Sequence, residues 1–132
     1  MKQFGRISLI ILLILNGLFF ITNIYVLGNT QAAIDMHEDL ARSAGPVMAN
    51  FKVINCFITG LLYVMAAYGL IRKRKGFILS GVYGAVFFFS FYIVELVLWG
   101  TSHPTVWIGF SIFGTLSFVL GYFSFKYWQK TS

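Results

Sequence analysis

Charged residues are scarce in this sequence. Of its 132 residues, 11% are Asp, Glu, Lys or Arg, whereas 58% are hydrophobic. A soluble domain is about one-quarter charged, and one soluble core could not hide this much apolar surface. The scarcity of charge therefore excludes an ordinary soluble domain. It indicates an integral membrane protein whose surroundings are the lipid bilayer.

Cysteine, histidine and acidic residues are also few. Cys56 is the single cysteine and stands inside an apolar run, so an intrachain disulfide and Cys-x-x-Cys redox chemistry are excluded. His37 stands beside Glu38 and Asp39, but one histidine among carboxylates lacks the ligand number of a metal site. We therefore predict no bound metal and no cofactor.

Motifs of catalysis and of nucleic-acid binding are missing. The sequence has no Ser/His/Asp arrangement, no His-Glu-x-x-His and no phosphate-binding glycine loop, so we do not expect an enzyme. The net charge is +6, but the basic residues stand at the ends of apolar runs. That placement is typical of orientation signals beside anionic lipid rather than of a nucleic-acid interface.

Long apolar runs dominate what is present. About twenty apolar residues cross a bilayer core of roughly 30 Å, and such runs cover 7–27, 51–71, 77–99 and 105–125. They predict an all-α protein with a single domain over 1–132, folded as a bundle of four transmembrane helices. The first run is also open to interpretation as a cleaved signal peptide, but the apolar core of such a peptide has only about 7–15 residues.

The basic segment Arg72-Lys73-Arg74-Lys75 is the densest charge run and predicts a tight turn between the second and third spans. Lys and Arg prefer the cytoplasmic side. With four spans, the basic residues expected on one side are Lys2, Arg6, Arg72, Lys73, Arg74, Lys75, Lys126 and Lys130. Only Arg42 and Lys52 fall on the other side. Both termini should thus be cytoplasmic, and we expect a bacterial inner membrane.

The segment 29–45 is the only long hydrophilic stretch. Asp35, Glu38 and Asp39 share one side at helical spacing, and apolar residues share the other. This pattern predicts a short amphipathic helix in the first outward loop, lying on the membrane surface or over the mouth of the bundle. A solvated connecting loop and a docking lid are the alternatives.

Glu95 is the one ionisable residue well inside an apolar run, and charges in lipid usually have a reason. It lies about one helical turn from the outer end of its span, and Lys52 lies just inside the outer end of the preceding span. The short turn makes these helices antiparallel neighbours, which predicts a Lys52–Glu95 ion pair supported by Asn55 and Tyr92. The alternatives are a carboxylate that binds protons, ions or a cationic substrate, and a side chain that reaches the headgroups.

Other polar residues follow single helix faces. Lys52, Asn55, Thr59 and Tyr63 form one stripe on the second span. Asn16 and Asn23 stand one heptad apart on the first span. Polar faces in lipid should point at protein.

Small residues form two faces that permit close helix contact. The members are Gly76, Ser80 and Gly84 on the third span, and Gly114, Ser117, Gly121 and Ser124 on the fourth. One internal bundle hardly needs both faces. We therefore expect a non-catalytic accessory or assembly subunit that packs against a larger membrane protein. The alternatives are a small homo-oligomeric transporter or channel that uses Glu95, and a binder of quinone, sterol or lipid that uses the Phe-rich third span.

Two short motifs stand in the first half of the chain. The first span contains Leu15-Asn16-Gly17-Leu18-Phe19-Phe20, and the second contains Thr59-Gly60-Leu61-Leu62 before the basic turn. The first two spans and the turn resemble the DoxX-like group of small four-helix membrane proteins, which share Gly-x-x-Phe and Gly-Leu-Leu at these places. The basic residue that usually follows the first motif is replaced here by Thr22, Asn23 and Tyr25. The resemblance implies a four-helix bundle, in a group that includes oxidoreductase subunits and assembly helpers.

Overall fold

The computed structural model describes residues 2–26, 31, 35, 46–99 and 104–130. All secondary-structure elements in these ranges are helical. Four segments are long and apolar enough to cross a membrane, and they cover Phe4–Tyr25, Val47–Arg72, Lys75–Glu95 and Trp107–Lys130. The predicted all-α class and the number of spans are therefore confirmed. The amphipathic helix predicted over 29–45 lies outside the described residues, except for Gln31 and Asp35, whose side chains are hydrogen-bonded at 3.1 Å.

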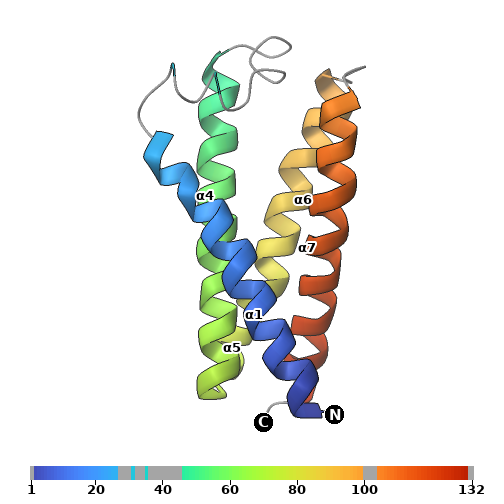
Figure 1. The fold of residues 1–132 in the computed structure, drawn as a ribbon. Helices are drawn as coiled ribbons and strands as arrows, with labels where there is room; N and C mark the ends of the chain where they lie inside the picture. The colour runs from blue at the N-terminus through green and yellow to red at the C-terminus, as the bar shows by residue number, and fades with distance from the viewer. Residues whose placement is uncertain (1, 27–30, 32–34, 36–45, 100–103, 131–132) are drawn as a thin grey trace.

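The helices form an elongated bundle (Figure 1). Its elements are α1 (Lys2–Ile21), the 3₁₀ helix η1 (Thr22–Val26), α4 (Pro46–Arg72), the short α5 (Lys75–Ile78), α6 (Ser80–Trp99) and α7 (Pro104–Lys130). The start of α1, the end of α7 and α5 lie together at one end of the bundle, here called the terminal end. The opposite end, where η1 and the start of α4 lie, is called the loop end.

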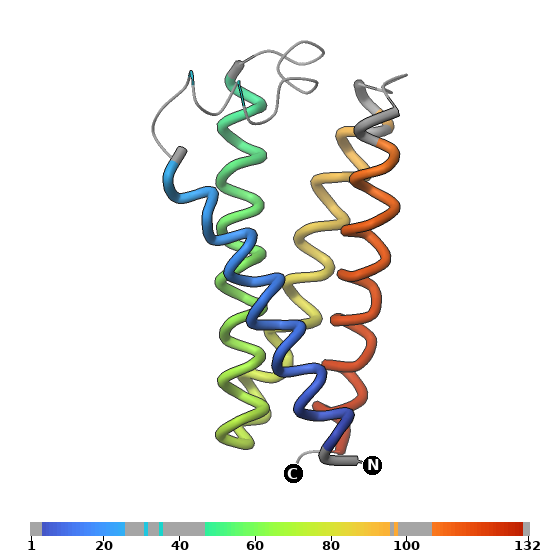
Figure 2. The backbone as a smooth tube through the Cα atoms, in the orientation of Figure 1, coloured from blue at the N-terminus to red at the C-terminus, as the bar shows by residue number. Residues whose placement is uncertain are grey.

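The four long helices do not pack equally. Helix α4 packs against both α1 and α6, and α6 packs against α7, whereas α1 has little contact with α7. Figure 2 shows the reason: α1 crosses the bundle obliquely, close to α7 at the terminal end and away from it at the loop end. The bundle is consequently closed at the terminal end and splayed at the loop end.

The two prolines of the chain each begin a helix. Pro46 is the first residue of α4 and Pro104 is the first residue of α7. The first helical position suits proline, because its missing N–H would have no partner inside the helix and its fixed φ is already helical. Both helices extend beyond the predicted spans of 51–71 and 105–125, because residues that flank the apolar runs are also helical.

Helix α1 tightens into a 3₁₀ helix after Ile21. The side chains of Thr22 and Asn23 donate hydrogen bonds to the carbonyl oxygens of Phe19 and Phe20, three residues earlier. Such local bonds compete with the backbone ladder of an α-helix. They explain why the last turn of the first span changes its winding here.

The basic turn ends α4 with a left-handed residue. Lys73 has a φ of 55°, and the N–H of Arg74 donates to the carbonyl oxygen of Gly69 over 2.9 Å. This 6→1 bond is the Schellman arrangement, in which the residue after the helix normally is glycine. Arg6 of α1 supports the same helix end by donating from its guanidinium to the carbonyl oxygens of Leu70 and Ile71.

We predict that Lys73→Gly stabilises the protein by about 1 kcal/mol, because glycine adopts a positive φ without the steric penalty of a side chain. Unfolding by SDS titration in mixed micelles, followed by circular dichroism, measures this gain. Lys73→Ala is the matched control, since it removes the same charge but keeps the Cβ. A gain of equal size in both variants would assign the effect to charge and not to the backbone.

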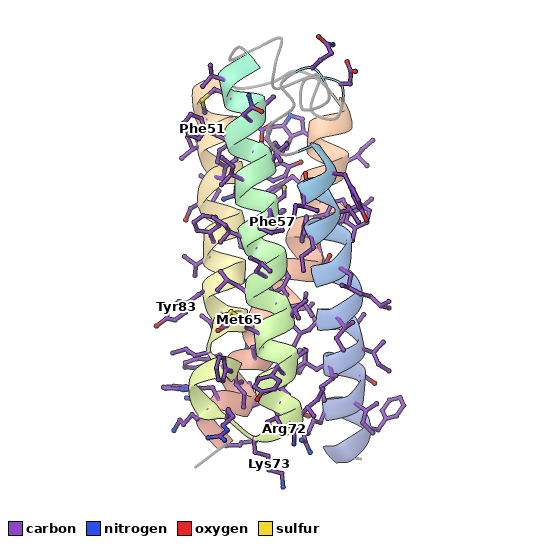
Figure 3. All side chains as sticks on the ribbon, turned by 90° about the vertical axis from the view of Figure 1, so that its left-hand side faces the viewer. Phe51, Phe57, Met65, Arg72, Lys73 and Tyr83 are labelled. Atoms are coloured by element: carbon purple, nitrogen blue, oxygen red, sulfur yellow. The ribbon has the colours of Figure 1, made fainter. Side chains whose placement is uncertain are left out.

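The outside of the bundle is apolar. Large hydrophobic side chains project outward from every long helix, and Figure 3 shows Phe51 and Tyr83 at the periphery of α4 and α6. Arg72 and Lys73 project at the terminal end, below the apolar belt. The interior holds the polar residues instead, among them Asn16, Asn23, Thr59 and Tyr63. This inside-out distribution is the one expected of helices surrounded by lipid.

Candidate functional site

Lys52 of α4 and Glu95 of α6 are in contact near the loop end. Lys52 Nζ donates a hydrogen bond to Glu95 Oε1 over 3.2 Å and lies 3.1 Å from Oε2. The second contact is electrostatic only, because no described group meets Oε2 with hydrogen-bond geometry. The Glu95 side chain is fully buried, whereas that of Lys52 remains 13% exposed. The pair therefore presents its cationic half to the surroundings and hides its anionic half.

Tyr92 and Asn55 take different places around this pair. The ammonium of Lys52 lies 4.7 Å from the centroid of the Tyr92 ring, one turn before Glu95 on α6. A cation over an aromatic face is stabilised by the ring quadrupole. The amide nitrogen of Asn55 instead donates to the carbonyl oxygen of Phe87 over 3.1 Å. Asn55 thus joins α4 to α6, while Tyr92 contacts the charge itself.

A cavity of about 320 Å³ adjoins Lys52. It lies where α1 diverges from α7, and its lining residues come from all four long helices and η1: Phe19, Phe20, Thr22, Asn23, Lys52, Cys56, Phe88, Tyr92, Gly109 and Phe113. Small-molecule sites in proteins usually measure about 300–1,000 Å³. The cavity is large enough for a small ligand, and Glu95 is not among its lining residues.

Aromatic rings build the walls of this cavity. The Phe20 ring lies 5.6 Å from both Phe88 and Phe113, measured between ring centroids. Phe19 stacks on Phe113 at 5.4 Å, and Phe88 contacts Tyr92 at 5.2 Å. Apolar walls with one charged group at the edge are suited to an amphipathic molecule. In Figure 2, α1 leans away from α7 toward this end of the bundle, and the cavity is lined by residues of both helices.

Another hollow, of about 350 Å³, lies at the terminal end and is lined by Met65, Arg74, Lys75, Gly76, Phe77 and Ser80. It is a shallower depression on the surface beside the basic turn. Lys75 also contacts α7, with its ammonium 4.8 Å from the centroid of the Trp128 ring. This hollow has no aromatic enclosure comparable to the first, so we place the candidate site at Lys52.

The predicted small-residue positions lie mainly inside this chain. Ser80, Gly84, Gly114, Ser117, Gly121 and Ser124 are all buried. On α7, a Cβ at Gly121 would come within 2.8 Å of the Cβ of Ala85 on α6. Gly76 differs, because it is exposed and has nothing within 4 Å of its Cβ position. The face on α7 is therefore occupied by α6, and the bundle itself uses both faces.

Several residues that shape the site were not predicted as site residues. Gly17 and Gly60 hold α1 against α4: a Cβ at Gly60 would lie 2.6 Å from the carbonyl oxygen of Gly17. Both belong to the motifs that carry the resemblance, but nothing in the sequence says that these motifs meet. Phe113 and Cys56 line the cavity from α7 and α4. The sequence carries no signal for Phe113, which is one of fifteen phenylalanines.

His37, Glu38 and Asp39 lie outside the described residues. Within the described ranges, no group of three or more His, Cys, Asp or Glu side chains is placed to hold a metal ion. The residues of the basic turn, Arg72 to Lys75, are exposed at the terminal end.

Four apolar helices around a partly polar interior define an integral membrane protein of the four-helix type. No family model, curated protein or solved structure matches the chain. The assignment of a function therefore depends on the geometry around Lys52.

Proposed function

We propose that this protein binds one small amphipathic molecule in the cavity beside Lys52, with the apolar part against the aromatic walls and the polar head at the ammonium. The cavity between α1 and α7 carries this proposal, because it combines a volume of about 320 Å³ with apolar walls and one charged donor. The predicted binding of quinone, sterol or lipid belongs to this class.

The donors of Lys52 support a defined position for the head. An ammonium has several N–H donors, and Lys52 gives one hydrogen bond to Glu95. Because Lys52 also lines the cavity, we infer that its remaining N–H donors serve a ligand there. An oxygen acceptor on a ligand would therefore be held at the loop end while the tail points toward Phe20 and Phe113.

Cys56 provides a direct test, because it lines the cavity and is the only cysteine of the chain. We predict that decanol, added to the protein in nanodiscs, slows the labelling of Cys56 by a membrane-permeant methanethiosulfonate at least several-fold. The bound molecule shields the thiol from the reagent. Mass spectrometry of the intact protein measures the labelled fraction with time.

The matched control is Gly76→Cys in a Cys56→Ser background, since position 76 is exposed at the other end of the molecule. Its labelling should not change when decanol is added. Equal slowing at both positions would mean that decanol acts on the reagent or the bilayer. No slowing at Cys56 at saturating decanol would contradict binding in this cavity.

We further propose that the terminal end faces the cytoplasm of a bacterial inner membrane and that the cavity lies in the outer half of the bilayer. The basic residues support this orientation: Arg6, the turn Arg72–Lys75, Lys126 and Lys130 all lie at the terminal end. Lys and Arg accumulate on the cytoplasmic side of membrane proteins.

The other predicted roles remain proposals. A role as an accessory or assembly subunit was predicted from two small-residue faces, and these faces pack largely within the chain. Because these faces are already covered within the chain, the main argument for a larger membrane partner is removed. We therefore favour ligand binding over the role of an accessory subunit. A homo-oligomeric transporter using Glu95 and the DoxX-like resemblance also remain predictions. Native mass spectrometry after mild extraction would separate a subunit, a homo-oligomer and a ligand-bound monomer.

A further inference from the structure

Lys52 and Glu95 form one ion pair beside the cavity, so their opposite charges compensate each other. Glu95 is fully buried, and Lys52 is the one charged side chain that contacts it among the described residues. Lys52 lines the cavity and Glu95 does not. A ligand entering the cavity therefore meets the cation and not the carboxylate. Any charge that it brings must be compensated inside apolar surroundings, where an unpaired charge is strongly unfavourable.

A neutral head and an anionic head have different consequences here. A neutral oxygen can accept a hydrogen bond from Lys52 without disturbing the ion pair. An anionic head forms its own ion pair with the ammonium, and two anions then share a single cation. The buried carboxylate is the anion that cannot reach solvent. One proton taken up from water by Glu95 restores the neutrality of the site.

We propose that the cavity accepts single-chain amphiphiles with an anionic head group, such as carboxylates or sulfonates, and that each binds together with one proton held by Glu95. This inference rests on the proposed function, because it specifies the ligand of the same cavity. In the bound state the head is paired with Lys52, and the protonated Glu95 is neutral. The anion and the proton enter from solution, so charge is conserved.

Glu95 is the group that can take up the proton. The ionisable side chains around the pair are Lys52 and Cys56 from α4 and Tyr92 from α6. At neutral pH an ammonium, a thiol and a phenol take up no further proton, whereas a carboxylate can. From α1, η1 and α7 the described lining residues are Phe19, Phe20, Thr22, Asn23, Gly109 and Phe113, none of which is ionisable. Among the described residues around the pair, only the Glu95 carboxylate is thus a proton acceptor.

The test uses a ligand that cannot itself change charge. Decyl sulfonate stays anionic from neutral to mildly acidic pH, so any pH dependence must come from the protein. We expect its affinity for the full-length protein in nanodiscs to rise as the pH is lowered, by up to about tenfold per pH unit, because binding takes up a proton. Calorimetry in two buffers of different ionisation enthalpy should count about one proton per ligand.

Two comparisons complete the experiment. Decanol, the neutral ligand of equal chain length, should bind with no pH dependence and no proton uptake. Glu95→Gln should bind decyl sulfonate independently of pH, because its amide takes no proton. Nanodiscs without protein correct for partition into lipid, and the proton count on the unmodified protein needs no variant to fold.

The outcomes separate the two proposals. If decyl sulfonate binds without proton uptake, or if only decanol binds, then the anionic class with its coupled proton is overturned and the cavity remains a binding site. If neither ligand binds, the proposed function fails with it. Unchanged proton uptake in Glu95→Gln would show that another group accepts the proton.

Discussion

Replacing Lys52 by Met is expected to destabilise the bundle by about 3–5 kcal/mol, which is typical when one partner of a buried ion pair is removed. Glu95 is fully buried and would remain as an uncompensated carboxylate inside apolar surroundings. Tyr92 would also lose the cation over its ring. Unfolding by SDS titration in mixed micelles measures the loss.

The second variant of this experiment shows whether the loss comes from the pair. Glu95→Gln alone should cost less, about 1–3 kcal/mol, because a neutral amide replaces the buried charge and still offers an acceptor to Lys52. The double variant Lys52→Met with Glu95→Gln should recover part of the loss of the first. A double-mutant cycle isolates the interaction between the two side chains.

Lys126→Met is a suitable control, because Lys126 is exposed and also lies over a tyrosine ring, 5.5 Å from the centroid of Tyr122. Lys126→Met should change the free energy of unfolding by no more than about 0.5 kcal/mol, as for most surface substitutions. Strict additivity of Lys52→Met and Glu95→Gln would rule out the pair as a source of stability. Equal losses at Lys52 and Lys126 would do the same.

Gly60→Leu is expected to prevent the normal packing of α1 on α4. A Cβ at Gly60 would lie 2.6 Å from the carbonyl oxygen of Gly17 and 2.9 Å from the backbone nitrogen of Ile21. Backbone atoms of a helix cannot move aside without moving the whole helix. We expect the free energy of unfolding to fall by more than about 3 kcal/mol, at the upper end of overpacking effects. Decanol should also no longer protect Cys56 from labelling, since Phe20 of α1 lines the cavity.

Gly76→Leu is the matched control, with nothing within 4 Å of its Cβ position. It should fold and bind decanol like the unmodified protein. Size-exclusion chromatography in mild detergent and the same SDS titration report the fold of both variants. If Gly60→Leu were as stable as Gly76→Leu, then the close contact between α1 and α4 would not be needed for the bundle.

The polar contacts of the site were partly accessible from the sequence. Glu95 and Lys52 stand near the same end of adjacent antiparallel spans, so their depth follows from the helical rise of about 1.5 Å per residue. The structure brings their side chains together. The hydrogen-bond partner of Asn55 could not be predicted in this way. The rotation of α4 about its axis turns Asn55 toward the carbonyl oxygen of Phe87 and not toward the pair.

The cavity was not predictable in the same way. Its lining residues come from η1 and all four long helices, and α1 is inclined to the other three (Figure 2). The tilt of a helix is set by packing against its neighbours and not by its own apolar length. In this protein the contact between Gly17 and Gly60 sets how closely α1 meets α4, and it joins residues far apart in the chain.

By itself, the sequence determined the class of the protein, the number of spans and the shared end of the basic residues. Each of these depends on a local property: apolar length, the positions of Lys and Arg, and the short turn after Arg72. Only the tertiary structure decided that the small residues of α7 pack on α6, that α1 leans away from α7, and that Lys52 faces a cavity while Glu95 is buried behind it. The physical reason is that apolar helices in lipid lack a strong hydrophobic preference for one face, so close steric fit between distant segments selects the contacts.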